Sequence, residues 1–470
     1  MSTKVAERSE PVEKMIEAAA KGRALMGGTA AMRKAGKRFL PKFEAESEEA
    51  YRERRDLSWL FNGYRKTVRD MTGRVFSKPV EIAEGAPDQV VGWAENIDME
   101  GRDLSTFARE VFEDGLQSGV SYIMVDAPPR PEGVTRARAE SMNLRPYFVH
   151  LRVEDILGWK RETVDNVTVI TQLRIMETVS EPDPDDEFGT VKVEQVRVLD
   201  RTEESVQTRL FRKVEGREQW ALHDEPTISP MREITVVPFY ANRSGFWTGE
   251  PLLDDLADVN VAHWQSQSDQ RNILHFARVP ILFAAGRNDE DGPLVIATGT
   301  ATTATDPQAK LEWVEHTGQA IDAGRQDLKD LEFQMETHGL QLLVARPGAQ
   351  SATGEALDAE KETSTLSMTA DALQDAIEKA LEWMAAYAGF ADASIGASVN
   401  KEFGVGTLTA QELTLLLQAV NTGNMSRETF LRELARRGVI ASDVDPDEEA
   451  ERIGSAPPSM VGDPMALEDA

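Results

Sequence analysis

Three aspartates near the C-terminus, Asp443, Asp445 and Asp447, alternate along the chain as the first ligands of a calcium-binding loop do. Carboxylates at alternating positions of such a loop converge on one cation, and a glycine beside the third ligand makes the sharp turn. Here Glu448 stands at the glycine position, and Gly454 stands where a bidentate glutamate is needed. We therefore predict no metal site in this segment.

Other residue patterns for catalysis or cofactor binding are also missing from the sequence. The chain has no cysteine, which excludes disulfides, thiolate nucleophiles and cysteine-ligated zinc or iron–sulfur clusters. Its six histidines form no H-x-x-x-H pair, so a zinc site would have to be assembled from distant loops. Neither a phosphate-binding loop, G-x-x-x-x-G-K-[ST], nor a nucleophile elbow, G-x-S-x-G, occurs. We predict no catalytic residues, no metal and no cofactor, and a protein that is not an enzyme.

Basic residues gather in two places where they could meet phosphates. Seven lysines and arginines occur over Lys21–Lys42 without an acidic residue, which fits either a solvated helix face or a contact with a partner or DNA. A helical pair is expected over Leu413–Val420 and Ser426–Arg437, where Glu428 and Glu433 lie among the arginines. An ordinary helical hairpin explains this pair better than a DNA-reading helix-turn-helix, and both interpretations are kept.

Composition sets the broad class of the protein. The 470 residues are 41% hydrophobic and 28% charged, which predicts a folded chain of two or three units, or one body with distinct lobes. The N-terminus lacks an apolar run of signal length, and no apolar stretch is long enough to span a membrane. A net charge of −29 repels phosphate backbones, so tight DNA adhesion is disfavoured.

Hydrophobic periodicity indicates the elements of the first half. Helical spacing covers Tyr51–Met71 and Ser105–Gln117, and β-forming residues follow at Ser121–Val125. Runs of β-formers recur over residues 146–240, and their alternation is clearest in Val191–Val198. Such alternation predicts an antiparallel sheet with one solvated face.

The second half reads as long helices around a small β insertion. A helix over residues 251–277 has a polar centre, Gln265–Asn272, which we interpret as packing between subunits because single-domain core helices seldom have such a centre. The β insertion covers residues 278–317, and helical spacing resumes at Gln319–Gly339. After the loop Val344–Gly354 comes a helix predicted over Glu355–Ala388. Its apolar stripe consists of Leu366, Ala370, Leu373, Ile377, Leu381 and Met384.

Several short sequence segments add to the information in this order of elements. They are Asn62–Thr67, Gly73–Pro79, Val125–Pro128, Arg145–Tyr147, Asp155–Trp159, Leu253–Asn260, Ser268–Asp269 and Pro280–Leu282. With the order of elements, they resemble the bacteriophage portal family, in particular a subgroup of phage structural proteins catalogued as a domain of unknown function. The resemblance covers residues 25–453 and depends on the order of many weak motifs.

This resemblance implies an α+β, mainly α fold with a portal-like order of segments. The segments are a basic N-terminal arm (1–45), a wing with a helical lobe and an antiparallel sheet (46–250), a stem helix (251–277), a clip (278–317), a second stem helix (318–339), a tunnel loop (340–354), a long wing helix (355–390), a crown (391–453) and a flexible acidic tail (454–470).

The resemblance also implies a function and a set of partners. Portal subunits form a ring, here expected to hold about twelve copies, at one capsid vertex of the virion after assembly in the host bacterial cytoplasm. Double-stranded DNA passes through the ring during packaging and ejection. The expected partners are the terminase large subunit, which carries the ATPase, the major capsid protein and a head–tail connector, with no membrane involved. The alternatives are another virion assembly protein, such as a head–tail connector or minor capsid protein, and an enzyme with a dispersed site.

The loop Val344–Gly354 supplies the residues expected to face the DNA channel. Arg346 is its only charged residue, so the resemblance assigns it transient phosphate contact, with Gln350, Ser351 and Thr353 as neutral neighbours. The alternative is that Arg346 pairs with a carboxylate of an adjacent subunit. The chain's acidity likewise has two explanations: a channel along which DNA slides, or the solubility of a large ring-forming protein.

Overall fold

The computed structural model of the chain describes residues 4–128, 141–214, 219–277, 281–286, 308–314, 319–340, 352–390, 393–401 and 410–436, together with 138, 217 and 306. Two compact units are present: Met1–Asp358 with Ser364–Lys401, and Ala359–Thr363 with Glu402–Ala470. Helices account for 47% of the structure and antiparallel sheets for 24%. The predicted α+β class with a majority of helix is therefore confirmed.

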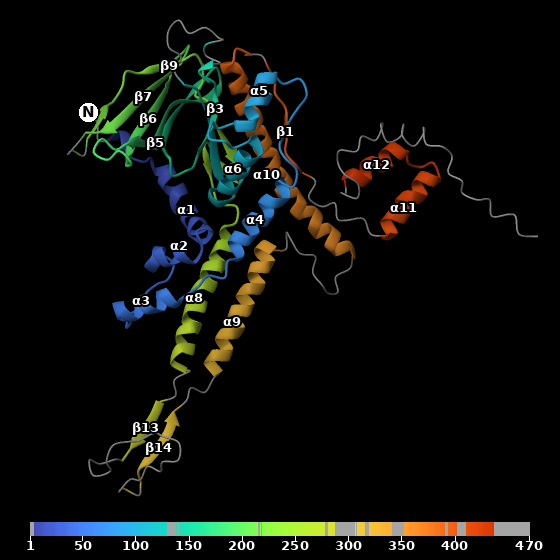
Figure 1. Cartoon of the computed structure of the whole chain (residues 1–470). Coiled ribbons are helices and arrows are strands. Elements are labelled where there is room, and N and C mark those ends of the chain that lie inside the picture. Colours follow the sequence, from blue (N-terminus) through green and yellow to red (C-terminus); the bar gives the residue numbers. More distant parts are fainter. Residues whose placement is uncertain are drawn as a thin grey trace, which may run out of the picture. The chain divides into compact units, whose positions relative to one another are not determined.

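Short helices open the first unit (Figure 1). They are η1 (Lys4–Ala6), α1 (Glu10–Met26), α2 (Gly28–Ala35), η2 (Gly36–Arg38), α3 (Glu48–Leu57), α4 (Gly63–Val75), α5 (Asp88–Trp93), η3 (Ala94–Asn96) and α6 (Leu104–Ser118). The single helix predicted over Tyr51–Met71 is wrong, because α3 ends at Leu57. Asn62 starts α4 by accepting a hydrogen bond from the Arg65 amide at 2.9 Å, and it donates to the Leu25 carbonyl at 2.6 Å. The break is thus fixed by a cap and by α1.

Two antiparallel sheets form the β part of this unit. The larger sheet contains β4 (Ile156–Val164), β5 (Val167–Pro182), β6 (Thr190–Arg201), β7 (Val206–Lys213) and β8 (Trp220–Leu222) in that order, with β9 (Thr227–Ser229) paired to β7. The smaller has the order β10 (Val236–Tyr240), β2 (Val120–Asp126), β3 (Tyr147–Leu151). Two short pairs are β1 (Glu81–Ile82) with β15 (Ala397–Ser398), and β11 (Arg243–Gly245) with β12 (Thr248–Gly249). The predicted antiparallel sheet over 146–240 is confirmed.

The two faces of the larger sheet are not as different as the alternation predicted. One face joins the main core, where Leu173 and Leu199 pack with α1 and the smaller sheet. The other face was predicted to be solvated, yet Val196 and Val198 are buried on it, with Val5 and Ala6 packed against them. The N-terminal segment therefore covers part of this face, which local alternation could not show.

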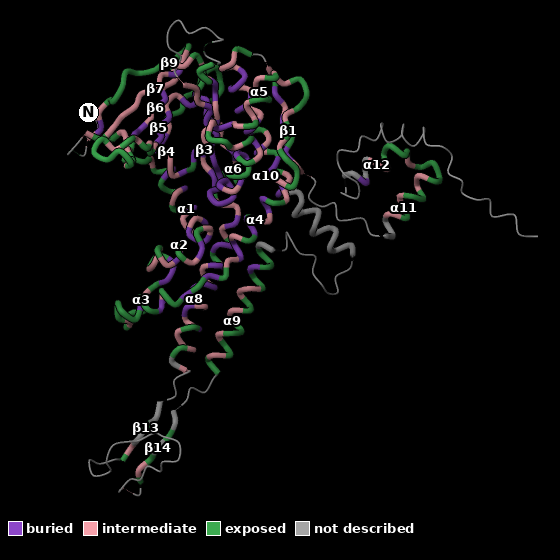
Figure 2. The backbone as a smooth tube through the Cα atoms, viewed as in Figure 1, coloured by how far each residue is buried: buried purple, intermediate pink, exposed green. Residues whose placement is uncertain are grey.

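Long helices follow the sheets. They are α8 (Asp254–Ala277), α9 (Gln319–Met335), the π-helical turn η5 (Glu336–Leu340) and α10 (Ala352–Tyr387). A hairpin of β13 (Ile281–Ala285) and β14 (Lys310–Val314) comes between α8 and α9, and Figure 1 shows it beyond the far ends of both helices. The predicted stripe of α10 is confirmed, since all six of its residues are buried. Figure 2 shows burial concentrated around α6, α10 and the sheets, and little of it on α9.

The second unit is described through α11 (Ala410–Asn421) and α12 (Arg427–Arg436). Ser426 begins α12 by accepting a hydrogen bond from the Thr429 amide at 3.0 Å. Gly423 has a φ of 74° in the turn between the helices, a conformation that glycine adopts without steric cost. The two predicted C-terminal helices are present.

Candidate functional site

Helices α8 and α9 form the candidate functional site, because they are paired side by side and bracket the β13–β14 hairpin. Three polar contacts join them: His263 with Glu332, Ser266 with Asp327, and Gln270 with the carbonyl of Ile321. Residue numbers rise along α8 while those of the partners fall along α9. The two helices are therefore antiparallel and are held in register by a polar seam.

Gly324 allows the close approach of the two helices at this seam. A Cβ atom on Gly324 would stand 2.0 Å from Oε1 of Gln270, whose side chain is buried. Gln270 Nε2 donates to the Ile321 carbonyl at 2.9 Å. The glycine thus gives Gln270 the space in which it binds the backbone of α9.

A buried histidine lies at the other end of the seam. His263 is 1% exposed, and its Nε2 atom is 3.4 Å from Oε1 of Glu332. Burial lowers the pKa of His263, and the neighbouring Glu332 carboxylate opposes this effect without reversing it. At neutral pH the imidazole is therefore neutral, and the pair is a polar contact between helices rather than a full ion pair.

The polar centre of α8 has partners within the same chain. Gln265 donates to the Phe39 carbonyl at 3.1 Å. Arg54 of α3 is buried, donates to Ser268 at 3.3 Å and lies 3.5 Å from a carboxylate oxygen of Asp269. Our interpretation that Gln265–Asn272 packs between subunits is therefore wrong for these side chains. Their partners are more than two hundred residues away in sequence, at Phe39 and Arg54.

The chain itself covers α9 poorly. Met335 is its one buried residue, and Ile321, Leu328 and Leu331, which lie on the same side as Gly324 and Met335, are only half-buried. Phe333 is 62% exposed. Because Ile321, Leu328, Leu331 and Phe333 all keep exposed surface, α9 has apolar surface available for a further contact.

Ion pairs anchor the start of α8 to helix α1. Lys21 of α1 lies 2.9 Å from Asp254 and 2.6 Å from Asp258. A second contact involves Glu250, which lies just before α8, and Gly119, which follows α6 and has a φ of +79°. A Cβ atom on Gly119 would stand 2.1 Å from the carbonyl oxygen of Glu250. Backbone therefore meets backbone where the sheets lead into α8, and only glycine fits at position 119.

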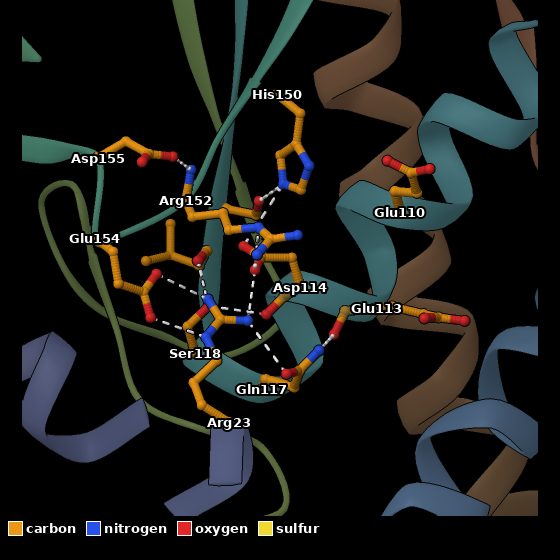
Figure 3. A network of polar contacts seen from close by, with 12 residues as sticks. Arg23, Glu110, Glu113, Asp114, Gln117, Ser118, His150, Arg152, Glu154 and Asp155 are labelled. Carbon is orange, nitrogen blue, oxygen red and sulfur yellow. Dashed lines mark hydrogen bonds and ion pairs between the residues drawn. The ribbon is translucent and has the colours of Figure 1, made fainter. Parts of the chain in front are cut away.

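A buried polar network lies behind this anchor (Figure 3). Arg23 of α1 has its Nη1 atom 2.6 Å from Oδ1 of Asp114 on α6, and it forms two hydrogen bonds with Glu154 at 2.9 and 3.0 Å. His150 of β3 lies 3.6 Å from Asp114 and bonds Ser121 at 2.8 Å. Arg23 thus connects α1, α6 and the end of the smaller sheet.

Hydrogen bonds and opposite charges together stabilise the ionised groups of this network. Burial acts to raise the pKa of Asp114, but His150 and Arg23 outweigh it, so that pKa lies below its ordinary value. Burial likewise acts to lower the pKa of Arg23, and Asp114 with Glu154 reverses the direction. Both groups are therefore ionised at neutral pH. Sequence reasoning missed the network, and no local motif brings these residues together.

The basic side chains of Lys21–Lys42 make several contacts inside the chain. Besides Lys21 and Arg23, Arg33 donates twice to the Ser58 carbonyl, at 3.0 and 2.7 Å. Lys37 and Lys42 both lie near Glu48, at 2.9 and 3.1 Å. Much of this charge therefore supports the fold, although Lys34, Lys37 and Arg38 are exposed.

The predicted channel residues lie outside what the structure describes. Arg346, Gln350 and Ser351 fall between η5 and α10, and Thr353 lies in the first turn of α10 without a described side chain. The aspartates from Asp443 onward also fall outside the described ranges. Within the described part of the chain, no group of three His, Asp or Glu side chains could hold a metal ion.

A cavity of about 590 Å³ lies between the sheets and the end of α10, lined by Asp126, Tyr147, Arg197 and Tyr387 among others. Arg197 is paired with Asp126 at 2.8 Å and with Glu177 at 2.6 Å. Burial is the main cause that raises the pKa of both Tyr147 and Tyr387. Both tyrosines are therefore protonated at neutral pH, and the arginine is paired with two carboxylates.

Residues 251–388, which include α8, α9 and α10, match a family described as "Domain of unknown function (DUF4055)". The resemblance drawn from the sequence was to phage proteins catalogued under such a domain, and the match agrees with that part of it. No curated protein matches the chain.

Two solved structures share weak similarity with the chain. The neck of a native GTA particle computed with C12 symmetry has a TM-score of 0.40 at 12% identity, covering 80% of this chain and 89% of that one. The neck of an empty GTA particle computed with C6 symmetry has a TM-score of 0.38 at 11% identity, covering 84% and 90%. TM-scores this low do not establish a common fold, so what those particles do is not transferred to this chain.

Proposed function

We propose that this chain is a non-catalytic subunit of a phage portal, a ring at one capsid vertex through which double-stranded DNA is packaged and ejected. The observation that carries the proposal is the antiparallel pair α8 and α9, which brackets the β13–β14 hairpin and is followed by the long helix α10. This is the order stem, clip, stem and wing helix that the sequence resemblance implies. Residues 46–250 then correspond to the wing, and residues 1–45 to the basic N-terminal arm.

The surface of α9 supports a role in assembly. Portal stems stand next to each other in a ring, so each stem helix needs one face for its own chain and another for a neighbour. α9 has a polar seam toward α8 and an outer side that carries the exposed Phe333. A helix pair of a protein that acts alone would be expected to cover more of its apolar surface.

The proposed ring has about twelve copies and meets several partners. The terminase large subunit supplies the ATPase, which this sequence lacks as far as motifs show, while the major capsid protein and a head–tail connector contact the ring from outside. DNA passes through the channel next to the loop that contains Arg346. The net charge of −29 favours weak, non-adhesive contact with the duplex.

Electron microscopy of the purified full-length protein, with mass photometry on the same sample, tests the proposal. The expected result is closed particles of about twelve copies with an axial hole. Monomers or dimers at high protein concentration would overturn it. Copurification with a terminase large subunit separates a portal from a head–tail connector or minor capsid protein, because only the portal docks the packaging motor.

A further inference from the structure

Segments of opposite charge lie on different sides of α8. Gln265 binds the carbonyl of Phe39, which directly follows η2, whereas Gln270 binds the carbonyl of Ile321 in α9. These glutamines are five residues apart, so at about 100° per residue they point about 140° away from each other around α8. Figure 1 shows α2 and α9 on opposite flanks of α8.

The two flanks carry complementary charge. Residues 33–43 contain five basic side chains and no acid, and Lys34, Lys37 and Arg38 among them are exposed; we call residues 33–43 the basic segment. Residues 319–340, which form α9 and η5, contain five carboxylates and two basic residues. Asp322, Asp330 and Glu336 are exposed there. The basic segment therefore has a net positive charge, although Lys37 and Lys42 lie near Glu48. α9 with η5 has a net negative charge, although Asp322 lies 3.0 Å from Arg325.

Each flank also carries an exposed aromatic ring. Phe333 of α9 is 62% exposed, and Phe43 at the end of the basic segment is 49% exposed. On the helical wheel of α9, Phe333 lies on the same side as Asp322 and Asp330, away from Gly324 and Met335. Aromatic residues are enriched at the centres of protein interfaces, and the rims around them are polar.

We propose that α9 of one subunit packs against the basic segment of the next copy of this chain. The inference rests on the proposed ring and names the surfaces that close it. A ring uses a heterologous contact, in which two different patches of one subunit meet their counterparts on its two neighbours. For about twelve copies the two patches must face about 150° apart, and the flanks of α8 are close to this angle.

Charge reversal in the full-length protein tests the contact. The variant Asp322→Lys/Asp330→Lys changes the sign of exposed α9 positions, and Lys34→Glu/Arg38→Glu changes the basic segment. Each should raise the protein concentration at which half the chains are in rings by at least about tenfold, because like charges then face each other. The four changes combined should bring that concentration back to within about threefold of wild type.

Matched controls separate charge complementarity from general damage. Lys329→Glu lies on the same exposed side of α9 but makes it more acidic, so at low salt it should leave ring formation unchanged or improve it. Glu162→Lys/Glu187→Lys makes the same charge change as the α9 variant on exposed positions of β4 and of the turn between β5 and β6 and should have no effect. Phe333→Ala tests the apolar part without changing charge and should weaken assembly. Circular dichroism and thermal melting verify that each variant is folded.

The outcomes distinguish this contact from the function on which it rests. If wild type forms rings but the α9 variant assembles like the sheet control, the contact is wrong and the portal assignment stands. If both reversals abolish rings and their combination does not restore them, the two surfaces do not meet. If wild type forms no ring at any concentration, both the portal assignment and this contact fall.

Discussion

Arg23 of α1 holds its Nη1 atom 2.6 Å from Oδ1 of Asp114, a carboxylate in α6 whose side chain is only 3% exposed. His150 and Arg152 approach the same carboxylate at 3.6 and 3.7 Å. One negative charge is thus shared by three basic side chains from different parts of the fold. Removing that charge leaves the mostly buried Arg23 without its contact to α6.

Asp114→Asn should destabilise the first unit by about 3–5 kcal/mol, the range for breaking one partner of a buried ion pair. Urea unfolding followed by circular dichroism measures the change. Glu113→Gln on the same helix is the matched control, because the Glu113 side chain is 28% exposed and lies 3.7 Å from Arg109; it should cost less than about 1 kcal/mol. Equal costs for the two variants would show that the Asp114 network contributes little.

Stability should fall as the pH drops below the ordinary histidine pKa, because folding lowers the pKa of His263 from its reference value of 6.5. The unfolded chain then binds a proton that the folded chain resists, so the stabilisation is complete above pH 6.5 and is lost below it. Melting temperatures between about pH 7.5 and about pH 5.5 measure this slope. His263→Gln should flatten it, whereas His223→Gln at an exposed position should not. A parallel slope in the His263 variant would contradict the assignment.

Gly119→Ala should destabilise the junction between α6, β2 and the start of α8. The added Cβ atom would meet backbone atoms of Glu250, which cannot rotate away, at a positive φ that alanine avoids. The expected loss of unfolding free energy exceeds about 1 kcal/mol. Gly73→Ala is the control, since nothing lies within 4 Å of its added Cβ atom in α4, and alanine there should be neutral or stabilising. Thermal melting of both variants checks the contrast.

Arg346→Ala should leave ring assembly intact and alter DNA packaging or retention. The arginine is the only charge of its loop, and a phosphate contact made by one cation depends strongly on that cation. Nuclease protection of packaged DNA provides the measurement, and Arg346→Lys, which keeps the charge, should behave more like wild type. Unchanged packaging in the alanine variant would assign Arg346 to a structural role or none.

The sequence pattern predicted those elements whose formation depends on residues close together in the chain. The stripe of α10 was readable because Leu366, Leu373 and Ile377 recur at helical spacing, and all three are buried. Strand β6 was readable from the alternation in Val191–Val198. The helix predicted across Leu57 failed because its end depends on Asn62, which bonds a carbonyl in α1. A tertiary contact of this kind leaves no trace in the spacing of apolar residues.

The contacts of the candidate site were even less visible in the sequence. The polar centre of α8 was readable as unusual, but its partners Phe39 and Arg54 come from distant segments, so the correct explanation required the fold. Asp114 is one of 81 acidic residues, and nothing in its neighbours marks it as buried. The order of helices and hairpin was predictable because it is a property of many segments together.

The backbone contact between Gly119 and Glu250 gives α8 a rigid pivot point at its start. Its 24 residues span about 36 Å at 1.5 Å per residue, so a tilt of about 1° at the junction moves the hairpin end by about 0.6 Å. At this pivot point backbone meets backbone, so no side chain is present to deform and absorb that rotation. Because this contact joins α6 and β2 to the segment that leads into α8, we expect a tilt of α8 to be transmitted to the centre of the first unit.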